Sequence, residues 1–143
     1  MLYSEINWLS AETERGLCLD LASLVEISEK SDFVISACPL TEETKHLIDA
    51  DFLAQMKPSS ILINISRGSV VDEEAVADAL EGGRLAGYAA AVFEMEDWVL
   101  PGRPKVVLER LLKQVEKTLL HQNTYLKKLL SKSLEYKRHP NHW

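Results

Sequence analysis

Two short segments contain the residues whose side chains are suited to catalysis or anion binding. Residues 64–73 read Asn-Ile-Ser-Arg-Gly-Ser-Val-Val-Asp-Glu, and residues 94–97 form the acidic run Glu-Met-Glu-Asp. The planar guanidinium of Arg67 can bind a carboxylate or a similar anion through two parallel hydrogen bonds. A carboxylate such as that of Glu96 can orient a histidine that acts as a base. Taken alone, an arginine at a strand end can equally form a structural ion pair, and an acid in an acidic run is usually a solvated charge.

Alternating strands and helices are expected to position these segments. Short β-branched runs predict three strands, and three-to-four-residue apolar spacing predicts the helices between them. The predicted strands cover residues 32–39, 60–65 and 85–93, and the predicted helices cover 21–30, 49–56 and 72–80. Asp72 can cap the third helix, and Gly82-Gly83 can end it. This order indicates an α/β protein with a parallel sheet, in which ligands bind at the carboxyl ends of the strands.

Length and composition indicate one globular domain in the cytoplasm. The chain has 143 residues, of which 46% are hydrophobic and 27% are charged. It contains no apolar run of about 18 residues for a membrane span, and its N-terminus lacks the pattern of a secretion signal. Cys18 and Cys38 are too few and too far apart for a disulfide framework or a metal site, so we expect free thiols. A net charge of -6 argues against nucleic acid as a partner.

The last third of the chain differs from the rest. Residues 1–98 contain 19 acidic and 6 basic side chains, whereas residues 99–143 contain 3 acidic and 10 basic ones. Leucines at three- and four-residue spacing predict a long amphipathic helix from about Lys105 to Tyr136, or two helices broken near residues 122–123. We therefore divide the chain into residues 1–104 and a divergent helical tail, residues 105–143. The helix would dock on the sheet or mediate dimerisation.

Residues 2–98 resemble the NAD-binding domain of the D-isomer-specific 2-hydroxyacid dehydrogenases. The resemblance depends on Asn64, Ser66-Arg67-Gly68, Val71-Asp72-Glu73 and Glu94-Met95-Glu96 at the family's spacing. Residues 92–98 are most similar to the phosphonate (phosphite) dehydrogenase branch. The resemblance implies NAD as cofactor, Arg67 as the catalytic arginine and Glu96 as the acid that orients the catalytic histidine.

The same resemblance implies a set of cofactor-binding residues. Glu5 matches the acid that accepts hydrogen bonds from the adenosine ribose, which favours NAD over NADP. Cys38, Pro39 and Thr44 match the loop that lines the cofactor cleft, and Ser66 is assigned to the same cleft. Without the resemblance, Glu5 is an exposed acid near a terminus, and Cys38-Pro39-Leu40-Thr41 is a turn that enters a helix.

Several family features are not recognisable in this sequence. The Gly-x-Gly-x-x-Gly turn belongs before the strand that contains Tyr3, and a substrate-binding domain belongs before that turn. Ala91 stands where the family has an aspartate. The Pro-His-Ile/Leu-Gly segment that carries the catalytic base is not recognisable after Trp98, and His121, near the expected distance, lies in a helical pattern. Without the glycine turn, we expect weak NAD binding, because the cofactor phosphates lose their backbone amides.

The predicted fold is therefore an incomplete doubly wound (Rossmann-like) parallel sheet plus a long C-terminal amphipathic helix. Three functions stay open: an NAD-dependent oxidoreductase of the family, inactive as an isolated chain; a non-catalytic remnant or interaction module; and one half of a split dehydrogenase. An incomplete sheet leaves an edge that needs a partner. That partner would be a second copy, joined through the tail helix or the sheet edge, or a complementary dehydrogenase fragment. A frame shift or a fusion would explain the tail.

Overall fold

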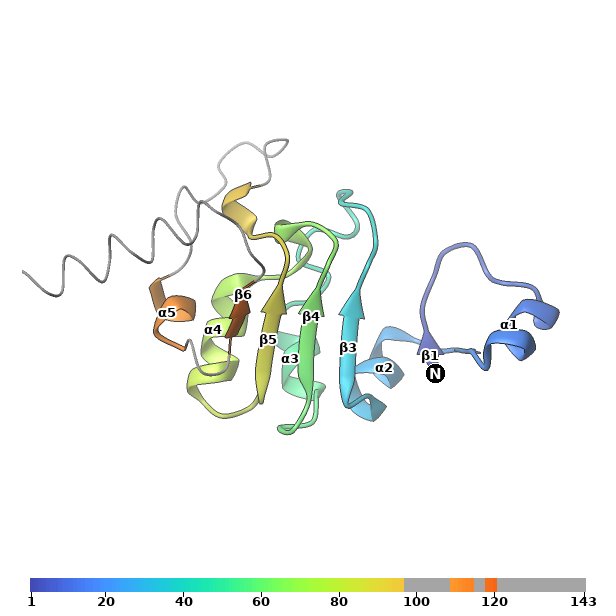
Figure 1. Ribbon diagram of the computed structural model, residues 1–143, viewed down its shortest axis with the longest axis horizontal. Coiled ribbons are helices and arrows are strands. Elements are labelled where there is room, and N and C mark those ends of the chain that lie inside the picture. Colours follow the sequence, from blue (N-terminus) through green and yellow to red (C-terminus); the bar gives the residue numbers. More distant parts are fainter. Residues whose placement is uncertain (97–108, 115–117, 121–143) are drawn as a thin grey trace, which may run out of the picture.

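The computed structural model describes residues 1–96, 109–114 and 118–120 (Figure 1). Strands and helices alternate along most of this part of the chain. No helix within these ranges is long and apolar enough to cross a membrane. The elements are β1 (Leu2–Tyr3), α1 (Ala11–Leu17), β2 (Asp20–Leu21), α2 (Leu24–Lys30), β3 (Phe33–Ser36), α3 (Ala50–Gln55), β4 (Ile61–Asn64), the 3-10 helix η1 (Gly68–Val70), α4 (Glu73–Glu81), β5 (Gly87–Ala90), the 3-10 helix η2 (Glu94–Glu96), α5 (Glu109–Lys113) and β6 (Thr118–Leu120).

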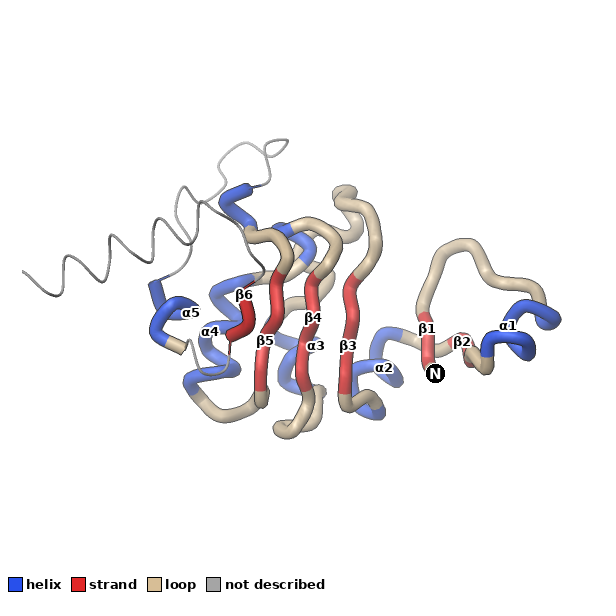
Figure 2. The backbone as a smooth tube through the Cα atoms, in the orientation of Figure 1, coloured by secondary structure: helices blue, strands red, loops and turns tan. Residues whose placement is uncertain are grey.

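The strands form two separate parallel sheets. One contains β1 and β2, and the other has the strand order β3-β4-β5-β6. In the larger sheet, Val34 is in register with Leu62, and Leu62 is in register with Tyr88. The two sheets lie apart in Figure 2, with β1 nearer to β3 than β2 is. The predicted α/β architecture with parallel strands is confirmed.

The hydrophobic core lies between the larger sheet and the helices on one of its faces. Helices α3 and α4 lie behind β3, β4 and β5 in Figure 1, and α2 packs beside α3. Leu62, Val76, Leu80 and Phe93 are fully buried there. Each fully buried aliphatic side chain of this size stabilises the fold by about 2 kcal/mol relative to an exposed one. This packing fixes the strands whose ends carry the predicted site.

Most predicted elements are confirmed with shorter bounds. Asp72 caps α4 by accepting hydrogen bonds from the backbone amides of Glu74 and Ala75, each at 3.1 Å. The predicted helix over residues 21–30 is wrong at its start, because Leu21 lies in β2 and the capping box of Ser23 and Glu26 begins α2 afterwards. We did not predict α1, a seven-residue helix that buries none of its side chains.

The long tail helix is not confirmed: its prediction agrees with the structure at residues 109–113 and is wrong at residues 118–120. Residues 109–113 are helical, but Thr118–Leu120 form β6, which pairs in parallel with β5, Leu119 in register with Ala89. Backbone hydrogen bonds at the otherwise open edge of β5 outweigh the helical pattern there. The other predicted helical residues, and with them His121 and the 122–123 break, lie outside the described residues.

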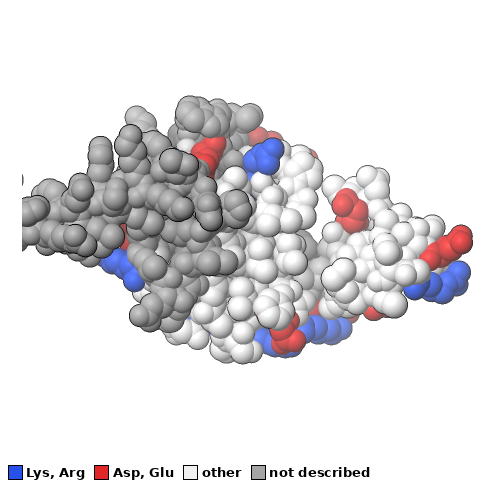
Figure 3. Space-filling view, viewed as in Figure 1, with Lys and Arg blue, Asp and Glu red and all other residues white. Residues whose placement is uncertain are grey.

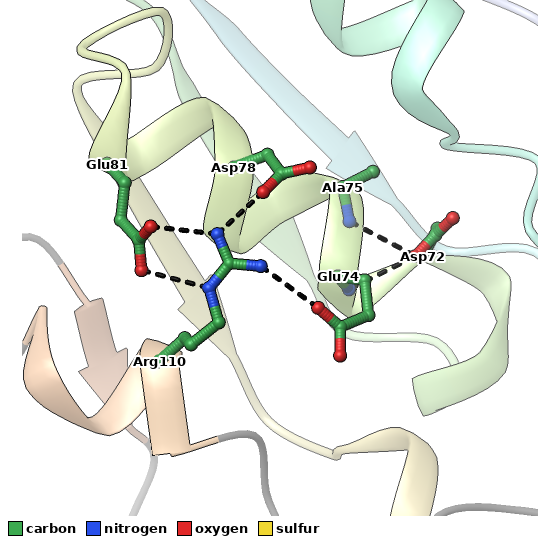
Figure 4. A network of polar contacts seen from close by, with 6 residues as sticks. All are labelled: Asp72, Glu74, Ala75, Asp78, Glu81 and Arg110. Atoms are coloured by element: carbon green, nitrogen blue, oxygen red, sulfur yellow. Dashed lines mark hydrogen bonds and ion pairs between the residues drawn. The ribbon is translucent and has the colours of Figure 1, made fainter.

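A cluster of ion pairs attaches α5 to α4 (Figure 4). The guanidinium of Arg110 donates to the carboxylates of Glu74 (3.1 Å), Asp78 (2.6 Å) and Glu81 (2.8 Å and 3.0 Å). Leu111, the next residue of α5, is fully buried in the core. This part of the tail therefore packs against residues 1–96 through both charge and apolar contact.

Candidate functional site

The predicted catalytic segments lie at the carboxyl ends of the strands of the larger sheet. Parallel neighbours β3, β4 and β5 end there, so the residues that follow each strand lie close together. Ser66 and Arg67 follow β4, and Glu96 ends the short helix that follows β5. Cys38 and Pro39 follow β3. The structure thus brings Arg67, Glu96 and the cofactor loop to the same edge, as the resemblance implies.

Asn64 is the polar centre of this edge. Its side chain is fully buried, and its Oδ1 accepts hydrogen bonds from Ser36 Oγ (2.9 Å), Ser66 N (3.0 Å) and Ser66 Oγ (2.8 Å). Its Nδ2 donates to the carbonyl oxygen of Arg67 at 3.0 Å. A buried amide costs free energy unless its hydrogen bonds are formed, so this network fixes the turn that follows β4. The Ser66 hydroxyl, predicted to line the cofactor cleft, is engaged in the network.

Arg67 is held through its backbone while its side chain is exposed. Its Nη1 donates to the carbonyl oxygen of Ser66 at 2.9 Å. No carboxylate among the described residues forms an ion pair with it, whereas Arg110 contacts three. Charge-assisted bonds to a planar carboxylate are the strong interactions of a guanidinium. Arg67 therefore has the exposure and the donors that an anion anchor requires.

Gly68 and Phe93 join the Arg67 segment to the Glu96 segment. A Cβ atom on Gly68 would lie 2.0 Å from the carbonyl carbon of Phe93, so only glycine permits this approach of two backbones. Phe93 is fully buried, and its amide donates to Glu96 Oε1 at 3.1 Å. Glu96, half-buried, thus closes the turn of η2 in this structure. Its predicted role beside a histidine stays a prediction.

One histidine–carboxylate pair was not anticipated. His46 Nε2 lies 2.8 Å from Glu94 Oε1, and the Glu94 amide donates to the buried carboxylate of Glu73 at 2.9 Å. His46 has a left-handed backbone (φ 50°), and its amide donates to the Ser69 carbonyl at 2.8 Å. The sequence treats Glu94 only as a neighbour of Glu96. His46 and Glu94 lie 48 residues apart in the sequence, and His46 has a positive φ. No local sequence pattern therefore predicts their contact.

Glu5 and Cys38 lie on opposite sides of the gap between the two sheets. Glu5 is exposed after β1, and its Oε1 accepts the amide hydrogen of Ile6 at 2.8 Å. In Figure 1 the arrows of β1 and β3 point in the same direction, so Glu5 and Cys38 both follow the carboxyl end of a strand on the same side. Burial raises the pKa of the Cys38 thiol, and the negative charge of Glu5 raises it further. Cys38 therefore stays a protonated thiol at neutral pH.

Hydrogen bonds within the loop after β3 hold its shape. Thr44 Oγ1 donates to the Pro39 carbonyl at 2.7 Å and accepts from the Thr41 amide at 2.7 Å. Pro39 is exposed and Thr44 is half-buried, so both border solvent at the strand ends. The described residues therefore fit a nucleotide only in part. Glu5 and the loop after β3 are in place, but none of the described residues forms a glycine turn in the space between β1 and β3 that could supply phosphate-binding amides.

Known proteins are similar to this chain in sequence and in fold. Residues 2–125 match the family described as D-isomer specific 2-hydroxyacid dehydrogenase, NAD binding domain. Glyoxylate reductase from Thermococcus onnurineus is 46% identical over 87 residues, which are 61% of this chain and 26% of that protein. D-mandelate dehydrogenase from Rhodotorula graminis superimposes with a TM-score of 0.74 at 32% identity, over 85% of this chain and 33% of that one. NAD-dependent formate dehydrogenase from Staphylococcus aureus, in complex with NAD, gives 0.61 at 28% identity, over 73% of this chain and 30% of that one.

These matches correct one expectation and identify the family. Glyoxylate reductases stand among the most similar curated relatives, which does not support the predicted closeness to phosphonate dehydrogenase. The family match extends past residue 104 to 125, so part of the predicted divergent tail is included in it. The chain spans about a quarter of the length of these relatives. It belongs to the D-isomer-specific 2-hydroxyacid dehydrogenases, as a part of their NAD-binding domain.

Proposed function

We propose that this chain provides the cofactor-side half of an active site that reduces a small 2-oxo acid of the glyoxylate type with NADH. One observation carries the proposal: the Arg67 guanidinium is exposed at the carboxyl edge of the sheet, on a turn fixed by Asn64, with no carboxylate partner among the described residues. A bidentate carboxylate ligand suits that position. The similarity to glyoxylate reductases supports a 2-oxo acid over phosphite.

Each residue has a defined task in this proposal. Arg67 binds and orients the substrate carboxylate, and Glu96 positions the group that carries the proton. Glu5 binds the adenosine ribose, while Cys38, Pro39, Thr44 and Ser66 form the wall of the cofactor cleft. NAD, when bound, supplies the redox chemistry. The group that donates the proton to the carbonyl oxygen is a residue outside the described part of the chain or on another polypeptide.

A chimera tests the proposal without requiring activity from the 143-residue chain alone. The matching 87 residues of this chain replace their counterparts in the Thermococcus onnurineus glyoxylate reductase. We expect NADH oxidation with glyoxylate, and about a hundredfold loss of kcat/KM on Arg67→Ala. Arg84→Ala is the matched control. Arg84 lies just before the amino end of β5, away from the proposed site, so this substitution is expected to leave kcat/KM unchanged. A folded chimera whose activity ignores Arg67→Ala would refute the assignment.

A second candidate is a non-catalytic interaction module, favoured by the incomplete sheet. Calorimetry with NAD separates it from a chain that binds cofactor by itself: we expect no micromolar binding without a glycine turn. We place the protein in the cytoplasm because Cys18 and Cys38 are both free thiols.

We further propose that the chain forms a dimer through the sheet edge or the tail. Light scattering tests this proposal, and a monomer of 16.1 kDa would exclude it.

A further inference from the structure

Three segments meet at the carboxyl ends of β3, β4 and β5, and each contacts the next. The loop after β3, residues 37–49, contacts η1 through the His46 amide, which donates to the Ser69 carbonyl oxygen at 2.8 Å. η1 in turn contacts η2 where Gly68 meets the backbone of Phe93. The side chain of His46 also reaches η2, so all three segments are joined to one another.

The contact between His46 and Glu94, here called the His46–Glu94 bridge, makes that last connection. His46 Nε2 lies 2.8 Å from Glu94 Oε1. An ionised carboxylate can only accept a hydrogen bond, so the imidazole donates. Figure 3 shows charged side chains at the surface of this end of the larger sheet, on the upper side of the view. The Glu94 side chain differs from them, because it is only 15% exposed, and water competes less for its hydrogen bond.

The backbone holds both ends of the bridge. His46 has a left-handed conformation, φ 50°, which residues other than glycine adopt only at a cost in free energy. Such conformations persist where the surrounding contacts require them. At the other end, the Glu94 amide donates to the buried carboxylate of Glu73 at 2.9 Å. Because both residues are fixed in this way, a displacement of one segment is transmitted to the other.

The bridge joins two segments that have different tasks in the proposed function. His46 lies two residues after Thr44, whose hydroxyl donates to the Pro39 carbonyl and holds the shape of the cofactor loop. Glu94 lies two residues before Glu96 in η2. Neither His46 nor Glu94 has been given a task so far. The bridge therefore connects the cofactor side of the site with the acid that positions the proton donor.

We propose that His46 and Glu94 are positioning residues that couple the loop after β3 to the turn that carries Glu96. Order imposed on the loop by a ligand is transmitted through the bridge to η2, and order in η2 is transmitted back by the same amount. Neither side chain exchanges a proton with the substrate. The coupling is a property of the folded chain, and only its consequence for the cofactor and for Glu96 rests on the proposed function.

Amide hydrogen exchange in the full 143-residue chain, followed by NMR, tests the coupling without cofactor or turnover. The reporters in the loop after β3 are the amides of Lys45 and Leu47, which donate to carbonyl oxygens of the same loop. Glu94→Ala removes only the side-chain acceptor, because the backbone amide at that position remains. We expect exchange at both reporters to be about tenfold faster, because a hydrogen bond to a charged group is lost.

His46→Asn breaks the bridge from the other end. Asparagine tolerates a left-handed backbone, but its side chain is shorter than that of histidine, so the contact with Glu94 is lost. We expect exchange about tenfold faster at the amides of Phe93 and Glu96, both of which are hydrogen-bonded within the η2 turn. Lys45→Asn, at the neighbouring exposed residue, is the matched control and is expected to leave exchange at these two amides unchanged.

Two further variants separate a coupled pair from two independent losses. Glu94→Gln retains an oxygen that can accept from His46, so exchange in the loop after β3 is expected to stay within about threefold of the wild-type rate. The double variant His46→Asn/Glu94→Ala is expected to match the single variants, because one contact can be lost only once. Circular dichroism confirms that the variants are folded. Glu94→Ala and its rescue by Glu94→Gln suffice if His46→Asn does not fold.

The consequence for the site is tested in the glyoxylate reductase chimera, built to include residues 37–96 of this chain. Glu94→Ala is expected to weaken NADH binding about tenfold by fluorescence titration, although Glu94 lies outside the cofactor loop. His46→Asn is expected to lower kcat about tenfold, in addition to any change in KM, because Glu96 is no longer held. A pair that serves only stability would change neither value well below the unfolding temperature.

The coupling and the proposed function fail separately. Exchange that changes only in the segment that carries the substitution, or that multiplies in the double variant, rejects the coupling. Reciprocal exchange together with an inactive chimera rejects the function and retains the coupling. An active chimera that depends on Arg67, in a chain whose two segments exchange independently, retains the function alone. Reciprocal exchange with unchanged NADH binding and kcat in an active chimera overturns the role of His46 and Glu94 as positioning residues.

Discussion

The segment β1-α1-β2 and the larger sheet with its helices are stabilised in different ways. The core cluster contains only residues from Val34 to Leu111, and between residues 1 and 22 only Ala22 is buried. The small unit depends instead on local polar contacts: the Tyr3 hydroxyl donates to Glu14 at 2.7 Å, and the N-terminal amine donates to the Cys18 carbonyl at 2.8 Å. Bonds of this kind at the surface contribute little net free energy, because water competes for the same donors and acceptors. A fold can therefore retain the shape of one half while stability is concentrated in the other.

The strongest test of this difference in stabilisation is a leucine-to-alanine substitution in each of the two regions. Leu62→Ala empties a fully buried position in β4, and we expect a loss of about 4 kcal/mol in the free energy of unfolding. Leu17→Ala, at a residue that is 62% exposed in α1, is expected to change it by less than about 0.5 kcal/mol. Urea titration measures both. Similar losses would mean that the small unit contributes to the core.

Substitution by alanine at two different glycines should change the stability of the fold in opposite directions. Gly68→Ala forces its Cβ against the backbone of Phe93, and we expect destabilisation of about 3 kcal/mol. Gly16→Ala meets no atom within 4 Å and lies in α1, where alanine favours the helix by about 0.5–1 kcal/mol. Thermal unfolding of the two variants checks the sign. A stable Gly68→Ala would show that η1 and η2 can separate freely.

The smallest expected effect concerns the helix that links the two regions. A hydrogen bond from Lys30, followed by those from Ser23, lowers the pKa of Glu26 to about 2. A carboxyl whose pKa is lowered by folding stabilises the fold above its unfolded pKa, and this contribution disappears as the pH falls toward 2. Glu26→Gln should therefore reduce Tm slightly at pH 7 and not at pH 2. Glu29→Gln in the same helix is the control. Because Glu26 is largely solvated, a large drop at pH 7 would contradict this account.

Elements that carry their own signals could be predicted from the sequence. The strands β3, β4 and β5 are β-branched or apolar runs, and Asp72 marks the start of α4 in a local pattern. Elements that depend on distant partners could not. Thr118–Leu120 becomes a strand only because β5 offers an edge, and β2 is two residues long and exists by pairing with β1.

The site divides along the same line. Arg67 and Glu96 could be expected at one edge because parallel strands end together, and the family resemblance gave their positions. The Ser36–Asn64 bond and the His46–Glu94 pair could not be expected, because each joins side chains that lie far apart in the sequence. The electrostatic effect of Glu5 on the pKa of the Cys38 thiol depends on how two separate sheets are arranged. Local periodicity contains no information on that arrangement.

The buried amide of Asn64 has a consequence for anion capture. It connects the ends of β3 and β4 to the Arg67 carbonyl, so folding has already ordered the backbone that presents the guanidinium. A ligand that arrives at Arg67 has only the side chain left to immobilise, at about 0.5–1.5 kcal/mol. Such an anchor is preorganised before any second domain or cofactor is present. The proposed recognition of a carboxylate by Arg67 therefore does not depend on catalysis.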